Sequence, residues 1–170
     1  CSSDLERRTA ELAAANATLQ ERAAAIADLY DHAPCGYHSV TPEGVVSAVN
    51  ATELALLGYE REEFVGQPIA RFLAPESRAR FRGDYDEFLR VGQVRDAEYE
   101  MVRKDGSLLP VLVSAVLMRD AQGRHLSNRA TLVDNSERKA RERQIDAMQR
   151  ELVRRADEAE TATQIGRAHV

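Results

Sequence analysis

The segment from residue 31 to residue 81 constrains the fold most, because it combines a tight turn with several very short structured pieces. Two short apolar runs, residues 37–40 and 45–49, flank the turn Thr41-Pro42-Glu43-Gly44. Proline presets one backbone dihedral angle of such a turn, and glycine supplies a positive φ. The pattern therefore predicts a β-hairpin at the start of this segment.

A series of short helices is predicted to follow the hairpin. Asn50 stands at the position of a helix N-cap, and Glu53, three residues later, comes close to completing a capping box. Gly58 is placed to end this first helix. A second acidic start at residues 60–63 and a third short segment at 68–75 come next. A hairpin followed by such short helices is typical neither of a helical bundle nor of a doubly wound sheet.

A longer helix is then predicted from about Pro75 to Gly92, with Ser77 as a candidate cap. Four residues share one face of this helix at helical spacing: Phe81, Tyr85, Phe88 and Leu89. Packing of this face against a sheet accounts for the stripe. A cofactor wall is the alternative interpretation.

Three strands are predicted in the next part of the chain, at residues 94–103, 108–118 and 124–133. In the first of them Ala97, Tyr99 and Met101 alternate with Glu98 and Glu100, as expected for a half-exposed antiparallel strand. An Asp-Gly turn within residues 104–107 joins the first two strands. With the hairpin these strands make a five-stranded antiparallel sheet with short helices on one face, an α+β architecture.

Residues 1–30 carry an apolar residue at every seventh position, at Leu5, Leu12, Leu19 and Ile26. This period predicts a left-handed coiled coil with these residues at the d positions. The a positions are then Ser2, Thr9, Asn16, Ala23 and Tyr30. Asn16 is the type of polar a residue that fixes register and favours a parallel two-stranded coil. The alternative is a single amphipathic helix that lies back on its own domain.

A second long helix is predicted from Ser136, a candidate cap, to about residue 163. Ile145, Met148 and Leu152 follow an a/d-like spacing, but Arg155 occupies the next d position. We therefore expect a signalling helix that pairs only weakly by itself. Residues 164–170 depart from the helical pattern, and we expect them to be an artificial tail outside the fold.

Three short motifs occur in a fixed order along the chain. The first is Asn50-x5-Leu56-Leu57-Gly58-Tyr59-x2-Glu62-Glu63-Phe64-Val65-Gly66. The second is Arg103-Lys104-Asp105-Gly106-Ser107, and the third is Leu132-Val133-Asp134-Asn135-Ser136-Glu137-Arg138. They resemble the start, the G–H hairpin turn and the exit motif of a PAS domain of the S-box type. The resemblance covers about residues 31–138 and implies a PAS fold at 31–135, between an N-terminal coiled-coil helix at 1–30 and a C-terminal signalling helix at 136–163.

The exit motif consists of Asp134, Asn135, Ser136, Glu137 and Arg138, and the resemblance implies that it joins the last strand to the output helix. Asp134 is then expected to pair with a nearby basic side chain and, with Ser136, to hold the start of the helix. An ordinary helix cap is the alternative. Members of the family usually have Ile or Val in place of Asn135, so we expect looser packing at this junction.

Composition and motifs exclude several classes of function. The chain has no phosphate-binding glycine motif and no His/Cys/Asp cluster with ligand spacing, so we expect no catalysis and no metal site. A net charge of −5 gives no basis for nucleic-acid binding. No apolar run is long enough to cross a bilayer and no signal peptide is visible, so a cytoplasmic location is expected, although the parent protein could be membrane-anchored.

Cys35 and His38 are the one place where ligand chemistry is conceivable, because both residue types can bind haem iron axially. A haem or redox sensor is therefore one alternative. In the other, Cys35 packs at the domain entrance and His38 hydrogen-bonds on the first strand. The resemblance argues against the better-known cofactors, because residues 77–91 lack the histidine of oxygen-sensing relatives and the helical Asn-Cys-Arg motif of flavin-bonding relatives is absent.

Together these features predict a sensory module that couples a stimulus to helix rearrangement in a dimeric signalling protein of a two-component system. The expected partners are a second copy, paired through parallel coiled coils, and an output domain further along the same chain. The resemblance favours a histidine kinase as that domain, with a diguanylate cyclase second. The cofactor is left open, with haem or a small molecule as candidates. The expected pocket residues are His38, Leu56, Phe72, Phe81, Tyr85, Tyr99 and Met101. The alternative is a ligand-free dimerisation module whose interior is filled by side chains such as Leu56, Phe72, Phe81, Tyr99 and Met101.

Overall fold

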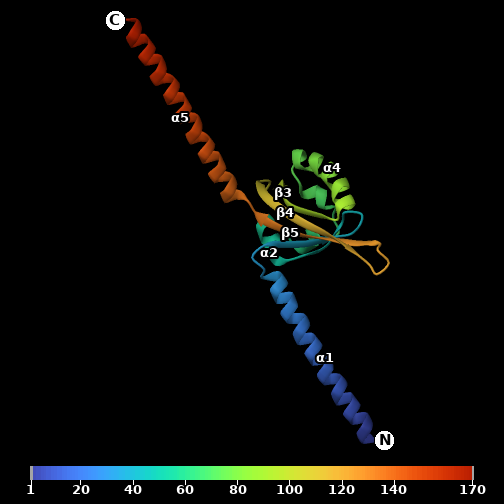
Figure 1. Cartoon of the computed structure of the whole chain (residues 1–170). Helices are drawn as coiled ribbons and strands as arrows, with labels where there is room; N and C mark the ends of the chain where they lie inside the picture. Colours follow the sequence, from blue (N-terminus) through green and yellow to red (C-terminus); the bar gives the residue numbers. More distant parts are fainter. Residues whose placement is uncertain (1, 170) are drawn as a thin grey trace.

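A five-stranded antiparallel sheet forms the centre of the protein, and two long helices leave it toward opposite ends (Figure 1). The computed structural model describes residues 2–169. The elements in chain order are α1 (Ser2–Asp31), β1 (Gly36–Val40), β2 (Val46–Val49), α2 (Ala51–Leu57), α3 (Arg61–Phe64), the 3-10 helix η1 (Ile69–Phe72), α4 (Pro75–Val91), β3 (Gln93–Val102), β4 (Leu108–Arg119), β5 (His125–Asp134) and α5 (Ser136–Ala168). The predicted α+β class is confirmed.

The strand order is β2-β1-β5-β4-β3, so the first strand lies beside the last one. The predicted hairpin of β1 and β2 is present, and Gly44 at its turn has a φ of 81°. On the other side of β1, His38 pairs with Ala130 of β5. This pairing brings the segment that follows α1 next to the strand that leads into α5.

The start of α2 differs in one respect from its prediction. Asn50 is the N-cap and its side chain accepts a hydrogen bond from the Glu53 amide, while Gly58 ends the helix with a φ of 77°. The side chain of Glu53, however, does not return to the cap, because it bonds to His38. The reciprocal capping box occurs instead one helix later, between Glu60 and Glu63.

The short helices and α4 cover one face of the sheet and enclose the core. Phe64, Leu57, Met101, Leu109 and Leu132 are almost completely buried there. Phe64 stacks on Phe72 with ring centroids 4.2 Å apart. Burial of such large apolar side chains is the main stabilising contribution in a domain of this size.

Both edges of the sheet are partly covered by other segments. Gly66 and Gln67 exchange backbone hydrogen bonds with Val46 on the β2 edge. On the β3 edge, the amide of Glu100 donates a 2.8 Å hydrogen bond to Oγ of Ser77. Ser77 is therefore not the cap of α4, which begins after Ala74 with no side-chain cap. Covered edges remove the unpaired backbone groups through which sheets aggregate.

The two long helices have no buried residue among those described. Tyr30 at the end of α1 is the partial exception, because its ring lies 6.0 Å from that of Tyr37 and it therefore docks on the domain. α5 continues to Ala168, past the end expected near residue 163. Ser136 is its first residue and not its cap, since the Ser136 amide donates to Oδ1 of Asp134 at 2.8 Å. None of the described helices is both long and apolar enough to cross a membrane.

Candidate functional site

A cavity of about 70 Å³ lies between α4 and the inner face of the sheet. Its polar lining residues are His38, Asp84, Tyr85, Tyr99 and Asn128, and apolar side chains such as Phe81 and Met101 complete the wall. Pockets that bind drug-sized ligands have volumes of roughly 300–1,000 Å³. This cavity is therefore suited to a few water molecules or a very small ligand.

Tyr99 on β3 and Asp84 on α4 close one side of the cavity. The phenol of Tyr99 donates a 2.8 Å hydrogen bond to Oδ2 of Asp84. Burial, followed by this hydrogen bond and the negative charge of Asp84, raises the pKa of Tyr99 well above its usual value. The guanidinium of Arg80 lies 5.1 Å from the centroid of the same ring, a cation–π distance.

A chain of polar contacts crosses from the beginning of β5 to α4. Asn128 is only 2% exposed, and its side-chain amide donates to the Tyr85 hydroxyl at 2.9 Å. Nε2 of His125 lies 2.7 Å from Oδ1 of Asn128 and donates to it, because an amide oxygen can only accept. The buried amide is thus satisfied on both sides.

His38 on β1 and Glu53 on α2 form a buried pair. Nδ1 of His38 lies 2.8 Å from Oε1 and 3.0 Å from Oε2 of Glu53. The His38 side chain is 7% exposed and that of Glu53 is fully buried. Burial lowers the pKa of His38, but the charge of Glu53 and its hydrogen bond outweigh this effect, so the net pKa is raised.

Asn50 connects the hairpin, α2 and the end of α1. Its Oδ1 accepts hydrogen bonds from the amides of Tyr37 and Glu53, at 2.8 and 3.0 Å. Its Nδ2 donates to the carbonyls of Tyr30 and Cys35, at 2.8 and 3.1 Å. All four bonds of this fully buried amide are used, so Asn50 holds three segments in one arrangement.

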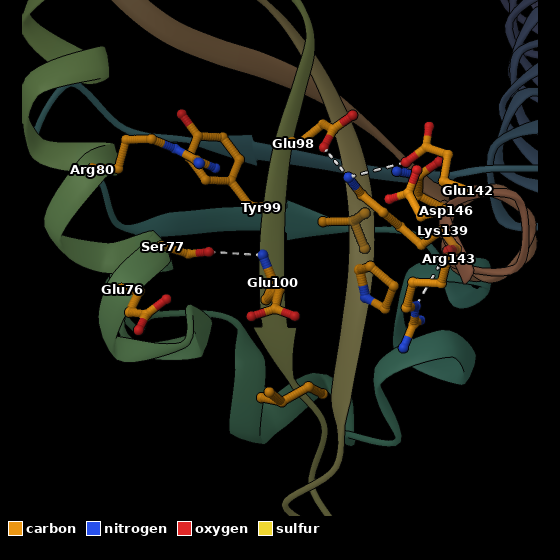
Figure 2. A pocket seen from close by; sticks show the side chains of 14 residues that line it. Glu76, Ser77, Arg80, Glu98, Tyr99, Glu100, Lys139, Glu142, Arg143 and Asp146 are labelled. Atoms are coloured by element: carbon orange, nitrogen blue, oxygen red, sulfur yellow. Dashed lines mark hydrogen bonds and ion pairs between the residues drawn. The ribbon is translucent and has the colours of Figure 1, made fainter. Parts of the chain in front are cut away.

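A second, more open cleft of about 830 Å³ lies where α5 leaves the sheet, between α4, β3, β4 and the first turns of α5 (Figure 2). Glu98 on β3 accepts ion-pair contacts from Arg138 at 2.6 Å and from Lys139 at 2.5 Å. Lys139 also lies 3.5 Å from Glu142 on the next turn. These charged contacts attach the beginning of α5 to the edge strand of the sheet.

Comparison of the sequence with models of protein families identifies the family of this domain. The family model described as a PAS domain matches residues 34–137, which is more than half of the chain. The chain belongs to the PAS-domain family. A PAS domain is a sensory and signalling module, and the sequence resemblance is thereby confirmed at this level.

Individual relatives of this PAS domain are distant. Phosphoserine phosphatase RsbP from Bacillus subtilis (strain 168) is 27% identical over 90 residues, which are 52% of this chain and 22% of that protein. The chain thus spans about a fifth of the length of this curated relative.

Solved structures share the fold of this PAS domain at low sequence identity. The PAS domain of an HTR-like protein from Haloarcula marismortui has a TM-score of 0.61 at 22% identity, over 70% of this chain and 96% of that one. A PAS domain of a protein from Colwellia psychrerythraea has a TM-score of 0.60 at 19% identity, over 69% and 96%. An RNA-binding light-oxygen-voltage receptor has a TM-score of 0.65 at 18% identity, over 74% and 36%.

The PAS cavity contains five of the seven expected pocket residues: His38, Phe81, Tyr85, Tyr99 and Met101. Leu56 and Phe72 do not line it. Leu56 is half-buried against the core and lies in a separate surface depression with Gly58. Phe72 is buried in the aromatic cluster around Phe64. Both residues are apolar and near the right place in the sequence, but the direction of each side chain depends on the packing of the short helices.

Cys35 and His38 do not fit a haem in this PAS domain. The cavity that His38 lines holds only about 70 Å³, which is far too small for a porphyrin ring. Cys35 is a free, partly exposed cysteine that precedes β1. Within residues 2–169, no cluster of three or more His, Cys, Asp or Glu side chains has the arrangement of a metal site.

The exit motif of the PAS domain is arranged differently from the expectation that Asp134 pairs with a basic side chain. Asp134 accepts the Ser136 amide, and no ion pair of Asp134 is found within residues 2–169. Arg138 is the residue of the motif that reaches back to the sheet, through Glu98. Glu137 pairs only with Arg141 on its own helix. Asn135 is 3% exposed, and its buried Nδ2 finds no hydrogen-bond partner among residues 2–169.

Sequence reasoning missed Glu53 and Asn128 as buried residues and Asp84 as a residue of the cavity wall. Asn128 carried a detectable signal, because it alternates with the inward-facing Ala130 and Leu132 along β5. Glu53 carried no such signal, because a glutamate three residues after an N-cap is typical of an exposed capping box. Asp84 lies on an exposed part of α4 and is itself exposed, so nothing in the local pattern distinguishes it.

Proposed function

We propose that this PAS domain passes a change in its interior to α1 and α5 and works as a homodimer through parallel coiled coils. The observation that carries the proposal is the unpartnered stripe of α1. Leu5, Leu12, Leu19 and Ile26 recur at intervals of seven and are 62–68% exposed. Full burial of one such side chain contributes about 1.5–3 kcal/mol, so pairing of two copies has a substantial driving force.

The direction of α1 supports pairing with a second copy over folding back. α1 extends away from the sheet (Figure 1), and its polar contacts with the domain are made near its end, at Tyr30 and Asp31. On α5 the stripe is weaker, with Ile145, Met148 and Leu152 54–65% exposed. The two helices would then be the input and output rods of a chain in which residues 31–135 are the sensory domain.

The output domain is proposed to lie further along the same chain. A histidine kinase is the first candidate and a diguanylate cyclase the second, because PAS–helix units commonly precede them. The relationship to RsbP adds a phosphatase as a third candidate. Under each of these, the PAS domain itself carries out no reaction.

A ligand-free module is the second candidate function, and the small volume of the cavity favours it. Phe81, Tyr99 and Met101 line this cavity, which leaves only about 70 Å³ for a ligand. An absorption spectrum and denaturing mass analysis of the purified fragment distinguish the two. A co-purified chromophore or small molecule would support a ligand sensor, and an empty protein would support the ligand-free module.

The dimer is tested by sedimentation equilibrium of the fragment and of matched variants. Leu12→Glu and Leu19→Glu place charges in the seam and should convert the dimer to a monomer. Ala14→Glu, at the outermost heptad position, is the control and should leave the dimer intact. Pairing through α1 would be refuted if the unsubstituted protein is a monomer, or if neither leucine variant changes the dimer.

Parallel orientation is tested by a disulfide. Thr9→Cys, in a chain whose Cys1 and Cys35 are replaced by serine, brings two thiols together only if the helices run in the same direction and in register. Rapid oxidation to a covalent dimer is expected. A failure to cross-link in a protein that remains dimeric would indicate an antiparallel or shifted pair.

A further inference from the structure

His38 and Glu53 are an imidazole and a carboxylate that share a buried site. Among the described residues, no other histidine and no other carboxylate is as deeply buried. Removing a charge from water is costly unless an opposite charge compensates for it. For the carboxylate of Glu53 the only hydrogen-bond partner found within residues 2–169 is Nδ1 of His38. The protonation state of His38 therefore decides whether Glu53 is compensated.

Other ionisable groups around the pair do not replace His38. From α1, Tyr30 lies near Glu53 and Asp31 accepts a hydrogen bond from the Ala51 amide, and both side chains add negative charge when ionised. From α3, Arg61 contacts the carbonyl of Val49 and lies 3.6 Å from Asp31, so its charge is shared with another carboxylate. The remaining titratable neighbours are Cys35 before β1, Asp84 and Tyr85 on α4, and Tyr99 on β3. None of these is a cation.

The pair is mechanically connected to the end of α1. Glu53 belongs to α2, and the first residues of this helix and its cap donate hydrogen bonds to the end of α1. The Ala51 amide donates to Oδ1 of Asp31 at 3.0 Å, and Oγ1 of Thr52 donates to the carbonyl of Asp31 at 3.2 Å. Asn50 adds its bond to the carbonyl of Tyr30. A movement of Glu53 therefore moves the groups that bind α1.

We propose that His38 and Glu53 form a proton-responsive latch that holds the end of α1 on the domain when His38 is charged and loosens it when His38 is neutral. The proton that leaves is the one on Nε2, because Nδ1 must keep its proton to donate to the carboxylate. That proton passes to water, and the carboxylate then remains buried with a neutral partner. Relief comes from movement of α2 toward solvent, which weakens its contacts with Tyr30 and Asp31.

The sign of the effect follows from linkage. Because the pKa of His38 is raised in the folded protein, the stabilisation is complete below the unfolded value of about 6.5 and is lost as the pH rises through the folded value. The latch is thus closed in mildly acidic solution and opens toward alkaline pH.

The test is an NMR titration of the fragment from about pH 5.5 to about pH 9, a window that brackets the ordinary histidine value. The ring nitrogens of His38 report its protonation directly. Amide exchange at Ala51, corrected for the intrinsic effect of pH, reports the contact with Asp31. We expect the protection of the Ala51 amide to fall as His38 loses its proton, with the same midpoint pH. The total fall should be about tenfold for each unit by which folding raises the pKa of His38. Amides of β4 and β5 should stay protected throughout.

Glu53→Gln keeps the size of the side chain and removes its charge, so it should lower the midpoint of His38 and abolish the pH dependence at Ala51. His32→Gln, which removes an exposed histidine near the same helix end, should change neither. If Ala51 protection stays constant while His38 titrates, or if His38 does not titrate in this range, the latch is refuted. The titration of the unmodified protein decides the question even where Glu53→Gln does not fold. The readouts lie within one chain, so the result is independent of dimerisation.

Discussion

Gly36 lies so close to Glu53 that a methyl group on Gly36 would stand 2.9 Å from the Cβ of Glu53. The same methyl group would stand 3.0 Å from Oε2 of the carboxylate. Because Gly36 of β1 has no side chain, α2 can approach the sheet closely enough for Glu53 to reach His38. This close approach, more than the capping of α2, determines where the buried carboxylate lies.

Gly36→Ala should destabilise the domain by about 1–3 kcal/mol, because α2 must move away from β1 or strain Glu53. Urea denaturation followed by circular dichroism measures the change. Gly83→Ala is the matched control: Gly83 is exposed on α4 with open space around it, and the same substitution should stabilise by about 0.5–1 kcal/mol. Equal effects of the two substitutions would contradict the contact between Gly36 and Glu53.

Tyr99 should remain un-ionised well above the ordinary tyrosine pKa of about 10. Its folded pKa is raised above the unfolded value of about 10, so the associated stabilisation is present below that value and is lost as the pH rises through the folded one. Tyrosinate absorbance as a function of pH measures this, and one phenol should ionise only with unfolding. Tyr99→Phe should remove that late step and cost about 1 kcal/mol, from the lost hydrogen bond to Asp84. An unchanged titration curve would disprove the assignment.

Asn135→Ile should stabilise the domain, by about 1 kcal/mol, because the buried Nδ2 of Asn135 has no hydrogen-bond partner. The backbone bond from the Asn135 amide to the carbonyl of Pro110 is retained. Thermal unfolding measures the effect, and Ala14→Ile, at the outermost heptad position of α1, is a comparison that leaves both the domain core and the α1 seam unchanged. A lower unfolding temperature for Asn135→Ile would show that the asparagine has a partner in solution.

Glu98→Gln should loosen the beginning of α5 with little change in the stability of the core. The pairs with Arg138 and Lys139 are exposed, so their global contribution is small and is screened by salt. We expect about a two- to fivefold faster amide exchange in the first turns of α5 at low salt, and no difference at high salt. Glu137→Gln, which breaks only a pair within α5, should leave exchange on the sheet side unchanged. The absence of a salt-dependent difference would argue against attachment through Glu98.

Local features of the fold were predictable because they depend on neighbours in the sequence. The turn at Gly44, the cap at Asn50 and the helix end at Gly58 each follow from the conformational preferences of a few residues. The heptad stripe of α1 is likewise a property of spacing alone. Predictions went wrong where a residue had a choice of partners. Ser77 accepts a hydrogen bond from the Glu100 amide on the edge strand and does not cap α4. Glu53 binds His38 and not the start of its own helix.

By itself the sequence determined the α+β class, the helical flanks and the PAS family. Periodicity, turn residues and the order of motifs can all be identified without knowing which distant segments are in contact. Only the tertiary structure decided that β1 lies between β2 and β5, and this placement puts His38 opposite Ala130 and beside α2. It also decided that Asp84 and Asn128 line the cavity and that Leu56 and Phe72 do not. The physical reason is that burial and pairing of a side chain depend on contacts between segments distant in sequence, which local preference does not specify.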